Sequence, residues 1–286
     1  MRFFARTSVA LLLLVALAIA PACGGGDSDS GGDIPDLTGE EYLDRARDAL
    51  AEVDSFRLAV DGTATIVPTQ GGALEGLSGL LSGDLNIEGA GPVVRDEGFS
   101  VDLTAQAGLP LQVNLTRAGD ELYASVLGQD FQLEVDSSVV SALDLGELFP
   151  TLAGWITDPT VDGSEEIDGV TTARLTGSID GERAARELDG LLSGISGVDA
   201  ADTQALADAL SDGTVTIWIG AEDFVPRRVD AEVEVPDGVP AAGLEQISLD
   251  VSASISEIGE DFTISPPDDA RTLSLDDIGG LIPGGP

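Results

Sequence analysis

The residues missing from this chain decide most of the chemistry open to it. The 286 residues contain no histidine and no lysine, a single cysteine, and 52 aspartates and glutamates. Histidine-dependent triads and metal sites cannot be built without an imidazole, and Schiff-base chemistry cannot proceed without a lysine amine. Carboxylates could hold calcium, but the acidic run from Asp27 has Thr38 at the twelfth position, where an EF-hand needs glutamate. The sequence therefore predicts no enzyme, no catalytic residues, no metal site and no cofactor.

The one thiol lies where an export signal would be cut. Arg2 and Arg6 precede an unbroken apolar run of 12 residues at 9–20, and small residues then lead to Cys23. This is the pattern of a secretory signal, and the run is shorter than the ~20 apolar residues that span a bilayer. The small residues before the cysteine resemble the lipobox of bacterial lipoproteins. That resemblance implies cleavage before Cys23 and a diacylglyceryl anchor on its sulfur.

Two outcomes are open at this site. Ala20 and Pro21 stand where the usual lipobox has leucine and then alanine or serine, so cleavage near Ala22 without lipidation is the alternative. We expect lipidation, because a lone cysteine in an exported chain otherwise needs a partner. Two acyl chains also anchor a protein stably where one chain does not. The protein is then expected on the extracytoplasmic side of the cell membrane, held there by its lipid.

Composition divides the rest of the chain. A Gly/Ser/Asp stretch follows the cysteine, and a stretch rich in proline and glycine ends the sequence. We expect a signal peptide at 1–22, a lipidated cysteine and flexible tether at 23–37, a folded domain at 38–267 and a tail along the surface at 268–286.

Charge excludes one class of partner. Thirteen arginines against 52 acidic residues give a formal net charge of −39. Nucleic-acid binding requires a basic footprint, so nucleic acid is excluded as a partner. We interpret the charge as a solvated surface that keeps the protein in solution.

Hydrophobic periodicity predicts a helix followed by a long series of strands. Thr38 and Glu41 have the spacing of a capping box, and apolar residues recur at helical spacing up to Val53. Period-two alternation, broken by short turns, then predicts about ten antiparallel strands, at 56–66, 85–87, 99–105, 111–115, 122–126, 131–135, 169–179, 215–219, 229–235 and 247–255. Helical spacing returns at 137–155, 181–192 and 202–210. The fold class is α+β, with one apolar sheet face that either closes on itself as a barrel or is covered by the helices.

Two segments carry a resemblance to a known family. They are EIDGVTTARLTGSID at 166–180 and TVTIWIGAEDFVPRRVDAEVEV at 214–235. The chain resembles the LppX/LprA/LprF/LprG lipoproteins, which share the LolA/LolB-like half-barrel, although Gly220 stands where aspartate is usual. The resemblance implies a single curved antiparallel sheet with a few helices on its concave apolar face. It also implies a cavity that accepts acyl chains of lipids or lipoglycans and carries them within the cell envelope, and it leaves open whether an envelope transporter takes part.

The inward-facing positions of the expected strands would line such a cavity. They are Leu58, Val60, Val101, Leu103, Val113, Leu115, Leu122, Val126, Leu175, Ile217, Ile219, Val229 and Val233. Two glycine-rich segments contain the same GLLSG string, and the first offers apolar residues for a lid, namely Leu74, Leu77, Leu80 and Leu81. Frayed loops with incidental repetition are the alternative to a lid. For Arg227 and Arg228, ion pairs with neighbouring carboxylates are favoured over binding of an anionic headgroup.

A second function stays open beside lipid carriage. Small inward residues suit a tightly packed core as well as an under-filled one. The alternative is therefore an envelope lipoprotein with a filled core, which acts as a scaffold or sensor and has no lipid ligand.

Overall fold

The structure, a computed structural model, describes residues 33–68, 83–107, 109–135, 140, 143, 145–146, 148–193, 207–208, 210–235 and 244–274. Along the chain, the helices and strands are α2 (Gly39–Ala51), β1 (Ser55–Pro68), β2 (Gly83–Val94), β3 (Gly98–Ala107), β4 (Leu109–Ala118), β5 (Glu121–Val126), β6 (Gln129–Glu134), α5 (Leu148–Trp155), β7 (Ile156–Ile167), β8 (Val170–Ile179), α6 (Gly181–Ser193), β9 (Thr214–Gly220), β10 (Pro226–Val235), β11 (Leu244–Ser256) and β12 (Arg271–Ser274).

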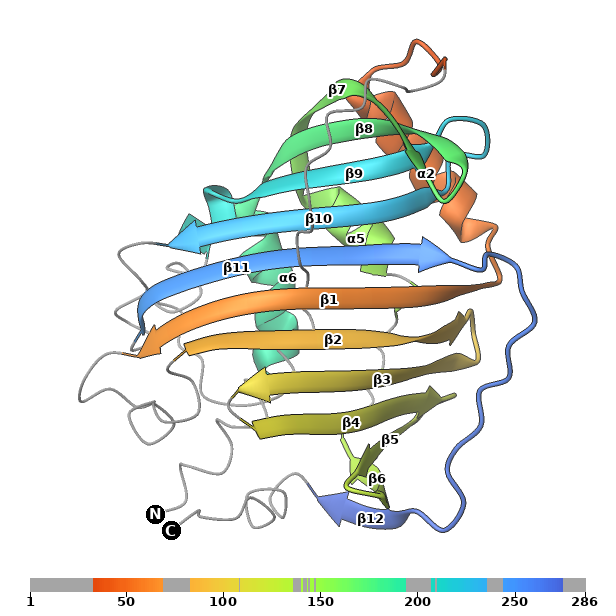
Figure 1. Cartoon of the computed structure of the whole chain (residues 1–286), viewed down its shortest axis with the longest axis vertical. Helices are drawn as coiled ribbons and strands as arrows, with labels where there is room; N and C mark the ends of the chain where they lie inside the picture. The colour runs from red at the N-terminus through yellow and green to blue at the C-terminus, as the bar shows by residue number, and fades with distance from the viewer. Residues whose placement is uncertain are drawn as a thin grey trace.

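All the strands belong to one sheet. Its order is β12-β6-β5-β4-β3-β2-β1-β11-β10-β9-β8-β7, so two antiparallel meanders, β1 to β6 and β7 to β11, join where β1 pairs with β11. Among the strands that the structure describes, only β12, which pairs with β6, is parallel to its neighbour. The sheet curves, and α2, α5 and α6 lie together on one side of it (Figure 1). The expected open, curved antiparallel sheet with a few helices is confirmed, with 12 strands rather than about ten.

The two extra strands are ones that period-two alternation could not reveal. In β7 the register shifts between Thr157 and Thr160 and again between Val161 and Gly163, so its side chains do not alternate regularly. Bulges of this kind are typical of edge strands, where they discourage pairing with another chain. The other extra strand, β12, has only four residues and lies in the segment expected to run along the surface.

The first helix forms where its capping box predicted. The Thr38 side chain accepts from the Glu41 amide at 3.2 Å, and the Glu41 carboxylate accepts from the Thr38 amide at 2.8 Å. These bonds satisfy two backbone donors that a helix start leaves free. At the other end, the Arg95 side chain donates to the carbonyls of Leu50 and Val53. Both ends of α2 are thus held by side chains.

α2 lies directly on the edge strand β7. A Cβ added at Gly39 would stand 2.1 Å from the carbonyl oxygen of Pro159, so glycine at this position permits the close approach. On the same face of α2, at helical spacing from Gly39, Tyr42, Leu43 and Leu50 are buried in the core. The helix therefore joins the core to the end of the sheet at β7.

The other helices differ in part from their expected bounds. Helical spacing predicted turns across 137–155. α5 occupies Leu148–Trp155, with Pro150 inside its first turn, where proline is tolerated. Residue 140 is also helical, and 137–139, 141–142, 144 and 147 lie outside the described residues. α6 begins after Asp180, whose side chain accepts from the Arg183 amide at 2.9 Å as an N-cap. Of the helix expected at 202–210, residues 207–208 and 210 are helical, and the others lie outside the described residues.

Candidate functional site

One line of apolar residues crosses the sheet on the face that carries the helices. Pairing places them side by side from β5 to β8, with Gly89 of β2 between Leu103 and Val60. We call this line the central row: Val126, Val113, Leu103, Val60, Ala253, Val229, Ile217 and Leu175. A Cβ at Gly89 would be 2.6 Å from a methyl group of Leu103, so the glycine leaves room for that leucine. The row is a continuous apolar track across nine strands, eight of which contribute an apolar side chain while β2 contributes Gly89.

Burial changes along the central row. On β8 and β9, Leu175 and Ile217 are buried in the core under the helices. From β10 to β5 the row is partly exposed, as at Val229, Val60 and Leu103. The next positions along β1 toward α2, Phe56 and Leu58, are buried again. The accessible part of the row, from β10 to β5, is thus bordered by buried core residues on β8 and β9 and on the side of β1 that faces α2.

The structure places all thirteen predicted cavity residues on this one face. Seven of them belong to the central row, and the other six lie two or four residues further along the same strands, which keeps them on the same side of the pleat. Seven are buried, namely Leu58, Val101, Leu122, Leu175, Ile217, Ile219 and Val233. Six are partly exposed, namely Val60, Leu103, Val113, Leu115, Val126 and Val229. That they line a lipid cavity stays a prediction.

Cys23 and the four lid leucines, Leu74, Leu77, Leu80 and Leu81, lie outside the described residues. Their anchoring and lid roles therefore stay predictions.

The arginine pair at 227 and 228 makes ion pairs, as expected from the sequence. Arg227 pairs with Asp223 in the turn before β10, and Arg228 pairs with Asp230 at 2.7 Å. The Arg228 guanidinium also stands 5.0 Å above the ring of Trp218. These contacts give both guanidinium groups partners within the protein.

A small cavity lies between the helices and the two central strands. Its volume is about 30 Å³, and its lining comes from α2, α5, the turn before α5, β1 and β11: Leu50, Phe56, Leu58, Leu145, Phe149, Leu152, Ala253 and Ile255. A cavity needs ~10–15 Å³ to hold one water and polar partners to keep it, so this apolar space is expected to be dry. It is also about tenfold smaller than the ~300 Å³ of the smaller ligand pockets. An acyl chain would fit here only if α5 moved away from β1 and β11.

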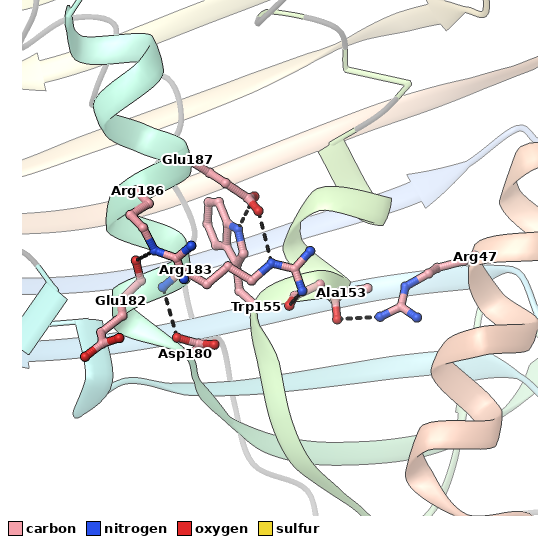
Figure 2. Close-up of polar contacts among 9 residues, drawn as sticks. Arg47, Ala153, Trp155, Asp180, Glu182, Arg183, Arg186 and Glu187 are labelled. Carbon is pink, nitrogen blue, oxygen red and sulfur yellow. Dashed lines mark hydrogen bonds and ion pairs between the residues drawn. The ribbon is translucent and has the colours of Figure 1, made fainter.

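Two arginines hold the end of α5 (Figure 2). Arg47 of α2 donates to the carbonyl of Ala153 at 2.9 Å, and Arg183 of α6 donates to the carbonyl of Gly154. The last carbonyls of a helix have no partner within it and carry partial negative charge, so cations are favourable there. A Cβ at Gly154 would be 2.7 Å from a guanidinium nitrogen of Arg183, so glycine allows the contact. We call Arg47 and Arg183, with the carbonyls of Ala153 and Gly154, the arginine clamp.

A carboxylate completes the junction between α5 and α6. Glu187 accepts from the indole of Trp155 at 2.6 Å and pairs with Arg183 at 3.0 Å (Figure 2). Burial opposes ionisation of Glu187, but the hydrogen bonds from Trp155 and Arg183 and the charges of Arg183 and Arg186 hold its pKa below the usual value. Backbone pairing adds a further link, since the Asp180 amide donates to the carbonyl of Trp155 at 2.6 Å. The α5 end is therefore fixed to both other helices.

The opposite face of the sheet is polar and acidic. Asp250 stands across from Glu232 and Thr63, and Asp61 stands across from Glu88. Burial raises the pKa of Asp250, and the charges of Glu232 and Asp230 raise it further against the opposing charge of Arg228. Burial and the charge of Glu88 likewise raise the pKa of Asp61. This face suits water, and the apolar chemistry is confined to the helix side.

The described residues offer no set of three His, Cys, Asp or Glu side chains arranged to hold a metal ion. Among the same residues, no helix has the length and hydrophobicity to span a membrane.

Sequence reasoning missed the arginine clamp and the residues around the small cavity. Arg47 and Arg183 look like ordinary surface arginines on polar helix faces, and nothing local marks a carbonyl partner 106 residues away. A weak signal existed for the cavity, because Phe56 opens the first strand and Phe149 opens a short apolar helix. Both are large side chains in a chain with few aromatics.

No protein-family model matches the chain, and no curated protein matches its sequence. Solved structures do. The chain is similar to the lipoprotein LppX of Mycobacterium tuberculosis, with 17% identity over 79% of this chain and 97% of that one and a TM-score of 0.46. It is similar to LprF of Mycobacterium bovis, with 15% identity over 82% and 99% and a TM-score of 0.48. It is also similar to a LolA superfamily protein from Nitrosomonas europaea, with 14% identity over 79% of this chain and 96% of that one and a TM-score of 0.27. The suspected resemblance to LppX and LprF is thus found among solved structures, and identities this low concern the fold alone.

Proposed function

We propose that this protein is an exported lipoprotein that binds acyl chains of lipids or lipoglycans on its concave face and carries them within the cell envelope. The observation that carries the proposal is the central row, an apolar track partly exposed from β10 to β5 beneath the helix layer. A diacylglycerol on Cys23 would anchor the chain to the outer side of the cell membrane. The proposed organisation keeps the signal peptide, tether and tail as the sequence predicts them.

Apolar contact alone would supply enough affinity. Burying an acyl chain of ~16 carbons at ~0.8 kcal/mol per CH₂ contributes roughly 12 kcal/mol before the costs of binding are subtracted. No charged anchor in the protein is required. This agrees with Arg227 and Arg228, whose charges are already paired with Asp223 and Asp230.

Access for a chain would come from movement of α5. Phe149 and Leu152 of α5 line the small cavity against Ala253 and Ile255 of β11, so raising α5 would join that cavity to the exposed part of the central row. The arginine clamp fixes only the C-terminal end of α5. Its first turn, which carries Phe149, is the end that would lift.

One observation favours a second function. The cavity of about 30 Å³ is too small for a lipid, as expected of an envelope lipoprotein with a filled core that serves as a scaffold or sensor. The two functions differ in what the protein holds when it is purified.

Native mass spectrometry of a soluble chain that begins after Cys23 separates them. Lipid carriage predicts co-purifying lipid that solvent extraction removes, and uptake of a fluorescent acyl probe by the extracted protein. A protein that is ligand-free before extraction and takes up no probe afterward would instead be the scaffold or sensor.

A further inference from the structure

The hairpin between β5 and β6 carries an apolar residue that the rest of the protein does not use. Leu127 is 86% exposed at its tip, and it is the one large apolar side chain in the described ranges that is exposed. Its φ is +52°, and Gly128 follows at +76°. A branched side chain is unfavourable at positive φ, so neither packing nor backbone preference explains a leucine here.

A second hairpin with the same geometry shows what the backbone alone prefers. The two-residue turn between β7 and β8 has φ values of +51° at Asp168 and +80° at Gly169. Asp-Gly and Asn-Gly are the preferred pairs for such turns. Leu127 occupies the position that Asp168 occupies there, which makes the leucine a departure from the favoured sequence.

The other positive-φ residues support this comparison. Among the described residues that are not glycine, seven have positive φ: four aspartates, Glu257, Phe224 and Leu127. Phe224 is held by packing, because its ring lies 6.0 Å from that of Tyr42 and beneath the guanidinium of Arg45. Leu127 has no comparable contact and faces solvent.

We propose that the tip at Leu127 is a membrane-contacting site, where the leucine enters the acyl region of the bilayer to which the chain is tethered. A stable protein interface buries ~800 Å² on each partner, which a single exposed leucine cannot provide. A bilayer needs no matching shape and accepts a single apolar side chain. The size of the exposed feature therefore favours a lipid surface over a protein groove.

The surroundings of the tip suit anionic headgroups better than the rest of this acidic protein does. The four residues of the turn, from Val126 to Gln129, carry no charge. Arg271 of β12 is exposed beside them, donates to the side chain of Gln129 and stands 5.1 Å above the ring of Phe131. A guanidinium next to an inserting leucine can contact a lipid phosphate at the depth of the headgroups. Of the nearby acids, Asp130 already accepts from Ser125, whereas Asp268 and Asp269, just before Arg271, are exposed.

The tip is also continuous with the candidate binding face. Val126, directly before Leu127, is the first residue of the central row, and it pairs with Val113. The β5–β6 hairpin lies at the end of the sheet away from α2 (Figure 1). A lipid leaving the bilayer at Leu127 would meet the accessible part of the row first.

Indole fluorescence on tethered protein tests the site. The full chain is held on phosphatidylglycerol–phosphatidylcholine vesicles, with its single cysteine, Cys23, coupled to a maleimide lipid wherever it is not already lipidated. Leu127→Trp is compared with Asp168→Trp, which places the same side chain in the same turn geometry on another hairpin. We expect lipids brominated on their acyl chains to quench the added emission of Leu127→Trp and to leave that of Asp168→Trp unchanged. Equal quenching, or none, overturns the proposal.

A second variant separates the site from simple folding effects. Leu127→Asn supplies a residue that the turn prefers, so the melting temperature should rise by about 2 °C. Acyl-probe transfer from vesicles should nevertheless slow about tenfold, the effect of losing one buried leucine. In a contrary outcome, the emission of Leu127→Trp shifts to shorter wavelength without vesicles while the molecular mass in solution doubles. The tip would then bind a second copy of the chain, and the proposal would be wrong.

The inference takes the anchor at Cys23 from the proposed function but does not require lipid carriage. Selective quenching at position 127 in a protein that takes up no acyl probe would retain the membrane contact and reject the carrier. Probe uptake without selective quenching would reject the membrane contact and retain the carrier.

Discussion

The two ends of the central row have the same kinds of residue and different surroundings. Leu175 and Ile217 are 2% and 1% exposed, whereas Leu103 and Val113 in the same row are partly exposed. Chain connectivity explains the difference, because α5 runs directly into β7 and α6 begins just after β8. The helices are thus joined covalently to the sheet at one end of the row.

The arginine clamp strengthens the same asymmetry. It ties the end of α5 to α2 and α6 close to the start of β7, at the buried end of the row. Over β1 and β11, α5 contributes Phe149 and Leu152 beside a small dry cavity. The same row of apolar residues therefore forms part of the core where α5 and α6 are fixed, and a partly exposed surface where they are not.

The sharpest test of this difference uses two leucines from the same row. Leu175→Ala should lower the free energy of unfolding by ~3 kcal/mol, because a cavity in a fixed core collapses poorly. The melting temperature should fall by about 6–12 °C. Leu103→Ala should cost ~1 kcal/mol or less, since its side chain is already partly in water. Urea denaturation followed by circular dichroism measures both, and equal losses would mean that the row is packed uniformly.

Filling the accessible part of the row should separate binding from stability. Leu103→Trp places an indole over Gly89 and Val113 and should reduce acyl-probe uptake about 5- to 150-fold, the result of a repacking cost of ~1–3 kcal/mol on binding. Thr104→Trp is the matched control, because the next residue along β3 points to the polar face of the sheet. Unchanged uptake by Leu103→Trp would remove the row from the proposed site.

Local patterns predicted the faces of the sheet well. Alternation such as Val101, Leu103 and Ala105 against Asp102 and Thr104 identifies an inward side without any knowledge of partners. For that reason the thirteen inward residues all share one face. The same logic failed for β7, where bulges at 158–159 and 162 interrupt the alternation.

Non-local features could not be predicted from the sequence. The central row depends on register across nine strands, and Val126 and Leu175, at its two ends, belong to one line only through that register. Whether a valine such as Val60 is buried depends on how far α5 and α6 reach, which the pattern of β1 does not contain. The clamp depends on backbone carbonyls, which are the same in every residue and leave no mark in sequence.

Weakening the arginine clamp should reduce the difference in accessibility between the two ends of the central row. Arg183→Met removes the donor to Gly154 and should cost ~1 kcal/mol of stability, a charged hydrogen bond discounted for its exposure. If α5 must lift to admit a chain, the rate of acyl-probe uptake should rise about fivefold, the equivalent of ~1 kcal/mol. Arg186→Met, one turn along on α6, loses a bond to the Glu182 carbonyl of its own helix and a charge near Glu187, but no bond to α5, so both quantities should change less than in Arg183→Met. Slower uptake by Arg183→Met would show that the clamp positions the site rather than restrains it.

The smallest expected effect is the loss of stability at the junction between α5 and α6 when the pH is lowered. The folded-state pKa of Glu187 lies below its usual value, so its ionised form stabilises the fold at neutral pH. That contribution is fully present above the ordinary carboxylate pKa of ~4.3 and is lost as the pH falls through the lower folded-state value. Glu187→Gln keeps an oxygen for the indole of Trp155 and removes the charge that pairs with Arg183.

Wild type should therefore melt above Glu187→Gln at pH 7, by no more than about 3 °C for a half-exposed ion pair worth under ~1 kcal/mol. The gap should close as the pH is lowered below 4. Asp250→Asn, on the polar face, provides a control of opposite sign, because the raised pKa of Asp250 means that its charge destabilises the fold at neutral pH. A gap between wild type and Glu187→Gln that widens in acid would contradict a stabilising carboxylate at the end of α5, and the buried end of the row would then be held by the arginines and the core alone.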